Sequence, residues 1–186
     1  TAIMQSSAKL ALYNGIYFGI VLVMLLYNLF IFFSVRDKSY LLYVMYILFV
    51  GFTQASDNGY TYKFLWPELP WLANFMVILF PALVGSTAIL FMRHFLLTAR
   101  HTPRLDKVLF IFIAVYGACV SLFLVGLPQA GYQLIQINAL VVSVFMLATA
   151  YKVMRKGFRP AKFFFFAWSV FLVSVCVFVM KDLGVL

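Results

Sequence analysis

Long apolar runs, each ended by a short group of charged or turn-forming residues, are the main pattern along the chain. The first run, residues 16–35, contains one strongly polar side chain, Asn28, before the charged group Arg36–Lys38. A helix rises ~1.5 Å per residue, so about twenty residues cover ~30 Å, the thickness of the hydrocarbon core of a bilayer. The run is therefore predicted to be a membrane-spanning helix.

The same pattern recurs along the rest of the chain and predicts an all-α fold, a polytopic transmembrane helix bundle. The six predicted spans are 16–35, 39–55, 71–91, 108–125, 133–151 and 163–180. Composition agrees, because 66% of the residues are hydrophobic and 10% are charged, whereas about a quarter are charged in soluble domains. We therefore expect residues 1–186 to form one transmembrane sensor or transducer domain in a lipid bilayer.

Positive charge gathers at alternate connections between the spans. Eleven of the 14 Lys and Arg residues fall in three clusters, 36–38, 93–107 and 152–162. Such clusters face the cytoplasm, so both Thr1 and Leu186 are expected outside. A cytoplasmic module after Leu186 would need one more span, and a seventh helix is therefore expected there. Nucleic-acid binding is disfavoured despite the net charge of +9, because the cations lie at span ends rather than on one face.

Polar side chains within the spans are the main candidates for ligand binding or switching. An unpaired amide in hydrocarbon costs several kcal/mol, so the amide side chains are expected to face the bundle interior. There they would form hydrogen bonds between helices, or take part in a ligand pocket or a switching contact. Pro81 interrupts the third span, and three interpretations remain open: a kink that serves packing, a hinge for signalling, or part of a transporter substrate site. The four amides are Asn28, Gln54, Gln136 and Asn138.

The connection 56–71, on the side opposite the basic clusters, combines turn residues with large aromatic side chains and two acids. It is the best candidate for contact with a sensor domain upstream, with an ordinary aromatic belt at the membrane interface as the alternative. The candidate contact residues are Asp57, Tyr60, Tyr62, Trp66, Glu68 and Trp71.

No catalytic residue, cofactor or metal is expected in this segment. The apolar spans contain no charged residue or histidine between their ends, so they lack the acid, base or proton relay of intramembrane enzymes and proton-coupled transporters. His94 and His101 lie beside Arg93 and Arg100, where a metal cation would be repelled.

Small residues in the spans are expected to serve packing. Cys119 and Cys176 each lie in an apolar run without polar neighbours, which favours packing over a disulfide or a metal site. The fourth span has small residues at helical spacing, which predicts close packing against a neighbouring helix. These residues are Ala114, Gly117, Ala118 and Ser121.

Short motifs at the ends of the spans resemble those of one family. They are the pair Tyr27-Asn28, the turn Arg36-Asp37-x-Ser39-Tyr40, the loop pair Trp66-Pro67 and the turn Arg159-Pro160-Ala161. With the segments GIYFGIVLVMLLYN and GFRPAKFFFFAWSVF around them, the chain resembles the seven-helix domain of bacterial 7TMR-DISM receptors, seven-transmembrane receptors with diverse intracellular signalling modules. The resemblance covers about Gly15 to Leu186.

This resemblance implies a transducer in the bacterial inner membrane. It implies, in the same chain, a periplasmic sensor domain, often a carbohydrate-binding jelly roll, and a cytoplasmic output module such as a histidine kinase or a GGDEF diguanylate cyclase. A homodimer is plausible for such a receptor. The alternative is a small-solute transporter or channel, although spans one to three do not resemble spans four to six as an internal repeat would require.

The predicted topology can be tested with a reporter enzyme that is active only in the periplasm. Fused after Leu186, the reporter should be active, and fused near Lys156 it should be inactive, because the basic cluster there is held inside. Activity measured on intact cells checks both fusions. The opposite pattern would overturn the orientation.

Overall fold

The computed structural model describes the backbone of residues 2–182 and the side chains of residues 12–173. Every regular element in that part of the chain is a helix, which confirms the predicted all-α architecture. The chain forms two compact units, residues 1–88 and residues 89–186, which are described separately below.

In the described part of the chain, five helices are long and apolar enough to cross a membrane. They are α1 (Ala2–Val35), α2 (Lys38–Asp57), α3 (Pro70–Phe95), α5 (Pro103–Leu124) and α6 (Pro128–Arg155). In α1 the candidate membrane span is Leu12–Val35. The sixth predicted span falls on α7 (Pro160–Asp182), whose described apolar part is Pro160–Val173. The side chain of Cys176 and the expected seventh helix lie outside the described residues. Two short helices, η1 (Thr61–Leu65) and α4 (Thr98–His101), lie in the connections.

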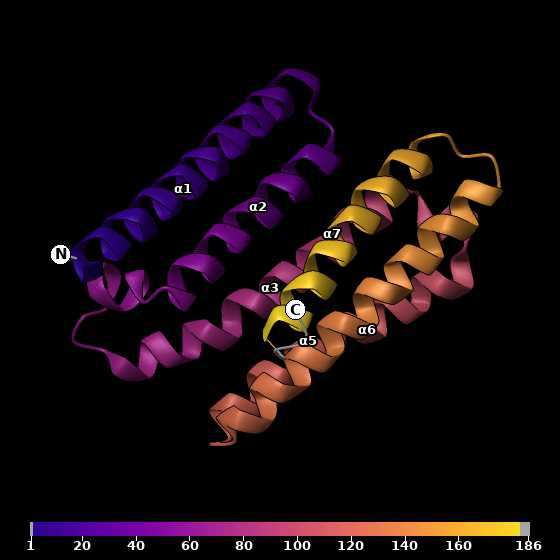
Figure 1. Ribbon diagram of the computed structural model, residues 1–186. Helices are drawn as coiled ribbons and strands as arrows, with labels where there is room; N and C mark the ends of the chain where they lie inside the picture. Colours follow the sequence, from indigo (N-terminus) through magenta and orange to yellow (C-terminus); the bar gives the residue numbers. More distant parts are fainter. Residues whose placement is uncertain (1, 183–186) are drawn as a thin grey trace. The chain divides into compact units, whose positions relative to one another are not determined.

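A tight turn joins α1 to α2, which run antiparallel side by side (Figure 1). Arg36 adopts the left-handed conformation, with φ at 57°, and its N–H donates to the Phe32 carbonyl at 2.7 Å. The next residue, Asp37, caps α2 by accepting the Ser39 N–H at 2.8 Å. The turn motif noted in the sequence thus ends one helix and begins the next.

Small and aromatic side chains hold the first unit together. A Cβ at Gly51 of α2 would lie 3.2 Å from Cγ1 of Val21, so the glycine sits where α1 and α2 approach closely. On α2, Val44 and Ile47 are buried, and Phe52 stacks on Phe80 of α3 with the ring centroids 5.0 Å apart.

In the second unit α5, α6 and α7 lie side by side (Figure 1). A buried stripe follows α6 at spacings of three and four, as one face of a helix requires. The stripe comprises Gly131, Ile135, Asn138, Val142, Met146, Thr149 and Val153. The opposing face of α5 buries Leu109, Tyr116, Cys119 and Phe123. From α7, Trp168 Nε1 donates to the Ser143 carbonyl at 3.1 Å.

The small residues of α5 do not face another described helix of the second unit. Ala114, Gly117, Ala118 and Ser121 are all exposed, so they do not provide the predicted close packing among the described helices of the second unit. The large side chains Tyr116 and Phe123 lie on the face that meets α6, and the small residues fall on the opposite side. The expected packing role of Cys119 is confirmed by its burial.

Helices α5 and α6 approach each other closely at Gly131. A Cβ there would stand 2.9 Å from the Cys119 carbonyl oxygen, a backbone atom that cannot move aside alone. Gly131→Ala should therefore push the helices apart and cost about 1–3 kcal/mol of stability. The measurement is the thermal unfolding midpoint of the protein in detergent.

Gly117→Ala is the matched control for this change. A Cβ at Gly117 meets nothing within 4 Å, and alanine favours a helix over glycine by about 0.5–1 kcal/mol. Its midpoint should equal or exceed that of the wild type. Equal midpoints for Gly131→Ala and the wild type would contradict the tight contact.

Candidate functional site

A cluster of polar side chains joins the end of α3 to the beginning of α5. Arg93 makes a bidentate ion pair with Asp106, with Nε and Nη2 at 2.7 and 2.9 Å from the two carboxylate oxygens. Thr98, which is fully buried on α4, donates its hydroxyl to Asp106 Oδ1 at 2.5 Å. We call Arg93, Thr98 and Asp106 the α3–α5 clamp.

The environment of the clamp favours its charged form. The guanidinium of Arg93 also lies 3.7 Å from the ring centroid of Phe110, a cation–π contact. Asp106 lies in the first turn of α5, before the apolar stretch that begins at Val108. Hydrogen bonds from Arg93 lower the pKa of Asp106 below its usual value, against an opposing effect of burial, and the Thr98 hydroxyl lowers it further.

The segment between α3 and α5 is also tied to the end of α6. Leu97, with φ at 50°, turns the chain from α3 into α4, and Leu96 is fully buried. The ring of His101 lies 4.9 Å from that of Phe158, and Lys156 Nζ donates to the His101 carbonyl. These contacts join two basic connections of the second unit.

The buried amides Asn28 and Asn138 have different roles. Asn138 on α6 donates to the Phe112 carbonyl of α5 at a long 3.4 Å, and its side chain also reaches the Tyr116 hydroxyl. This is the interhelical bonding expected from the sequence. Asn28 is buried, but it donates to the Met24 carbonyl of its own helix at 2.7 Å.

Gln54 and Gln136 differ from the expectation that all four amides face the interior. Both side chains are exposed. Helical spacing gives the reason: Gln136 follows the buried Ile135 by one residue, about 100° around the helix, and so leaves the buried stripe of α6. Gln54 lies on the same face of α2 as Ile47, which is seven residues earlier, but it stands in the last turn of the helix, where its side chain is exposed. Among the described residues of its own unit, neither glutamine lines a buried surface.

Pro81 lies inside α3, which continues as one helix from Pro70 to Phe95. Proline has no N–H, so the Val77 carbonyl loses its usual helical donor. The nearby hydroxyls do not compensate, because Ser86 donates to Ala82 and Thr87 to Leu83, each at 2.7 Å. Such bonds to the preceding turn also weaken a helix slightly.

The segment 56–71 divides into residues that pack inward and residues that are exposed. Tyr60 accepts a hydrogen bond from Asn14 of α1 at 3.0 Å and packs edge-on against Phe18. Trp71 stacks on Phe75 but remains 62% exposed. Among the other candidates for sensor contact, Trp66 is half-buried, and Asp57, Tyr62 and Glu68 are exposed. The exposed acids and Tyr62 leave a polar surface on this segment.

The α3–α5 clamp was not predicted from the sequence, which showed only a basic cluster there. One signal could have revealed it. Asp106 is the only acid among residues 93–107, and a lone carboxylate beside four arginines and lysines is expected to pair with one of them. Which cation pairs with it depends on the fold of the connection, since Arg93 is thirteen residues away.

The arrangement of long apolar helices is that of a multi-pass membrane protein. Among the described residues, no group of three or more His, Cys, Asp and Glu side chains lies close enough to hold a metal ion. The chain belongs to the 7TMR-DISM transmembrane family, described as 7TM diverse intracellular signalling, whose model matches residues 10–186. The resemblance seen in the motifs is thus confirmed. No curated protein and no solved structure matches the chain.

Replacing the clamp carboxylate should destabilise the second unit. Asp106→Asn leaves the mostly buried Arg93 without its counter-ion and should cost roughly 2–4 kcal/mol, because an unpaired buried charge is expensive. The unfolding midpoint in detergent measures the loss. Because the pKa of Asp106 is lowered, the wild type should keep this contribution at neutral pH and lose it as the pH falls through that pKa.

Glu68→Gln serves as the control, because Glu68 is exposed in the connection 56–71. Its free energy of unfolding should match that of the wild type within about 0.5 kcal/mol, so the two unfolding midpoints should nearly coincide. If Asp106→Asn were as stable as Glu68→Gln, the clamp would have no structural role.

Proposed function

We propose that this chain is the transmembrane relay of a receptor in a bacterial inner membrane. It transmits a signal from a periplasmic sensor domain to a cytoplasmic output module of the histidine kinase or diguanylate cyclase type. The observation that carries this proposal is membership of a family described by its intracellular signalling, across residues 10–186. The segment itself catalyses no reaction in this proposal, and the basic connections face the cytoplasm with the N-terminus outside.

In this proposal α3 carries the signal between the two units. The boundary between them falls after Ala88, inside α3, so a single continuous helix connects them. The stretch from Pro81 to Thr87, immediately before that boundary, combines a missing N–H with two hydroxyls bonded to preceding carbonyls. A local weakness at this point allows α3 to bend without unfolding either unit, as a hinge requires.

The two ends of the relay would use different surfaces. The exposed side chains of Asp57, Tyr62 and Glu68 offer polar and aromatic groups for contact with a sensor domain. At the end of α3, the clamp joins Arg93 to α5, so a displacement of α3 is passed to α5 through an ion pair rather than through a flexible loop.

The proposal is tested in the full-length protein, with its neighbouring domains, in membrane vesicles. Removing the sensor domain should change the activity of the output module, measured as autophosphorylation or as cyclic dinucleotide formed. Pro81→Ala restores the N–H and stiffens α3. In this variant, the effect of removing the sensor domain on output activity should be several-fold smaller. Its control is Pro128→Ala, at the first position of α6, where no helical hydrogen bond depends on the residue.

An output activity that is independent of the sensor domain would contradict the relay. Solute flux through vesicles that contain the protein, without any change in output, would support the transporter alternative instead. If removal of the sensor domain changed the output activity equally in Pro81→Ala and Pro128→Ala, the hinge in α3 would be ruled out, but the receptor function would not be contradicted.

A further inference from the structure

A basic pocket opens between the first turn of α5 and the last two turns of α6. Its volume is about 640 Å³, and half of the residues around it are cations with no acid among them. The lining residues are Thr102, Pro103, Arg104, Leu105, Tyr151, Lys152, Arg155 and Lys156. A concave surface with this charge attracts anions.

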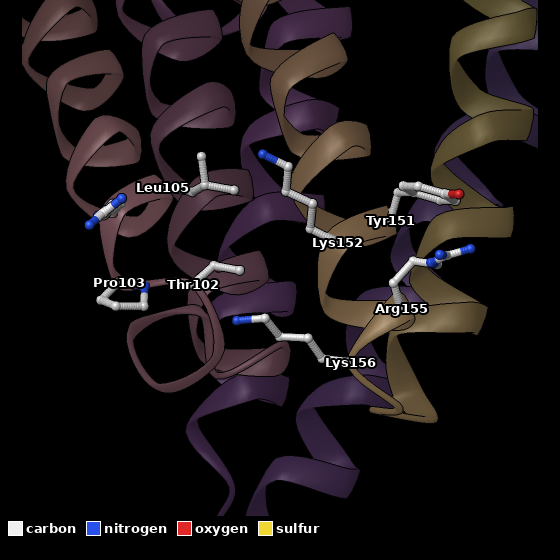
Figure 2. Close-up of a pocket in the computed structure, with 8 residues that line it drawn as sticks. Thr102, Pro103, Leu105, Tyr151, Lys152, Arg155 and Lys156 are labelled. Atoms are coloured by element: carbon white, nitrogen blue, oxygen red, sulfur yellow. The ribbon is translucent and has the colours of Figure 1, made fainter.

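Lys152 of α6 and Lys156, which directly follows this helix, face the start of α5. Figure 2 shows Lys152 and Lys156 extending from α6 towards Thr102, Pro103 and Leu105, whereas Tyr151 and Arg155 extend the other way in this view. The two lysines are one helical turn apart, so their ammonium groups can hold a single anion between them. The lysine at 156 is already positioned, because its Nζ donates to the His101 carbonyl.

The first turn of α5 adds its backbone to this positive surface. Thr102 occupies the N-cap position without making a capping bond, and its hydroxyl donates instead to the Thr98 carbonyl. The N–H groups of Arg104 and Leu105 therefore keep their hydrogen-bonding capacity at the positive end of a 22-residue helix. Phosphate groups bind readily in such a position.

The nearest carboxylate does not cancel this charge. Asp106 lies two residues beyond Arg104, but both of its oxygens are engaged by Arg93, and Thr98 bonds to one of them as well. The clamp thus neutralises the one acid of the connection and leaves the pocket cations for an anion from outside the chain.

The surroundings of the pocket favour a lipid over a free anion. Tyr151 lines the pocket beside the lysines, and its ring, which is 45% exposed, extends to the other side of α6 and lies 6.0 Å from the ring of Phe165. An amphipathic ring next to a basic cluster is typical of a membrane interface. About two turns further into the membrane, Ile111 of α5 and Val144 of α6 are 61% and 55% exposed. A charged site that continues into exposed apolar surface matches a headgroup joined to acyl chains.

We propose that this pocket binds the phosphate headgroup of an anionic phospholipid, such as phosphatidylglycerol, from the leaflet next to the basic connections. Lys152, Lys156 and Arg104 would hold the phosphate, and the acyl chains would follow α5 and α6. The site is independent of the receptor function proposed above, and only the identity of the leaflet rests on the proposed topology.

The test uses the full chain in a neutral detergent, titrated with phosphatidylglycerol or phosphatidylcholine, with retained lipid counted by native mass spectrometry. The wild type should retain phosphatidylglycerol in preference to phosphatidylcholine. Arg104→Gln combined with Lys152→Gln should weaken the binding of phosphatidylglycerol about tenfold to thirtyfold, the loss expected for two cations near a lipid phosphate. Both side chains are exposed, so the double variant should fold normally.

The matched control is Lys107→Gln combined with Lys162→Gln. It removes two exposed cations from the same connections but outside the pocket, and it should bind phosphatidylglycerol like the wild type. Equal binding of the two lipids, or full binding by the Arg104 and Lys152 double variant, would overturn the site. If millimolar inorganic phosphate displaced the lipid completely, the pocket would be a free-phosphate site and the lipid assignment would be wrong.

Discussion

The ion pair between Arg93 and Asp106 is the interaction on which the organisation of the second unit depends. It joins the last turn of α3 to the first turn of α5 across a connection that holds only the short helix α4. Both side chains are mostly removed from solvent, with 18% and 10% of their surface exposed. A charge in this setting is tolerated only with its partner and further hydrogen bonds, and Thr98 supplies the additional bond. The turn therefore has one well-defined conformation.

Within the spans, by contrast, lipid solvates apolar surface as well as protein does, so helices associate through close packing and a few polar contacts. Gly131 is an example of close packing, because it lets α6 approach the α5 backbone. Asn138 and Trp168 are examples of polar contacts, since each donates a hydrogen bond to a carbonyl of the neighbouring helix. The second unit thus combines an electrostatic fixed point at one end with contacts along the helices.

The positions of the helices could be predicted from the sequence, because the length of an apolar run is set by membrane thickness and needs no tertiary information. The sequence also indicated that Asn28 and Asn138 are buried. It could not show which face of a span meets another helix. Apolar residues surround each span on all sides, so periodicity carries little information, and the exposure of Gln54 and Gln136 followed only from the packing. The clamp escaped prediction because its two charges lie on different helices.

The short turn between α1 and α2 has a consequence for how the chain enters the membrane during synthesis. With only Arg36 and Asp37 between the helices, α1 and α2 form a hairpin whose charged tip stays outside the hydrocarbon core. Almost none of the apolar stretch of α1 is buried by protein, so α1 can partition into lipid alone. The less apolar α2 then enters alongside it, and the first helix acts as a membrane anchor for the second.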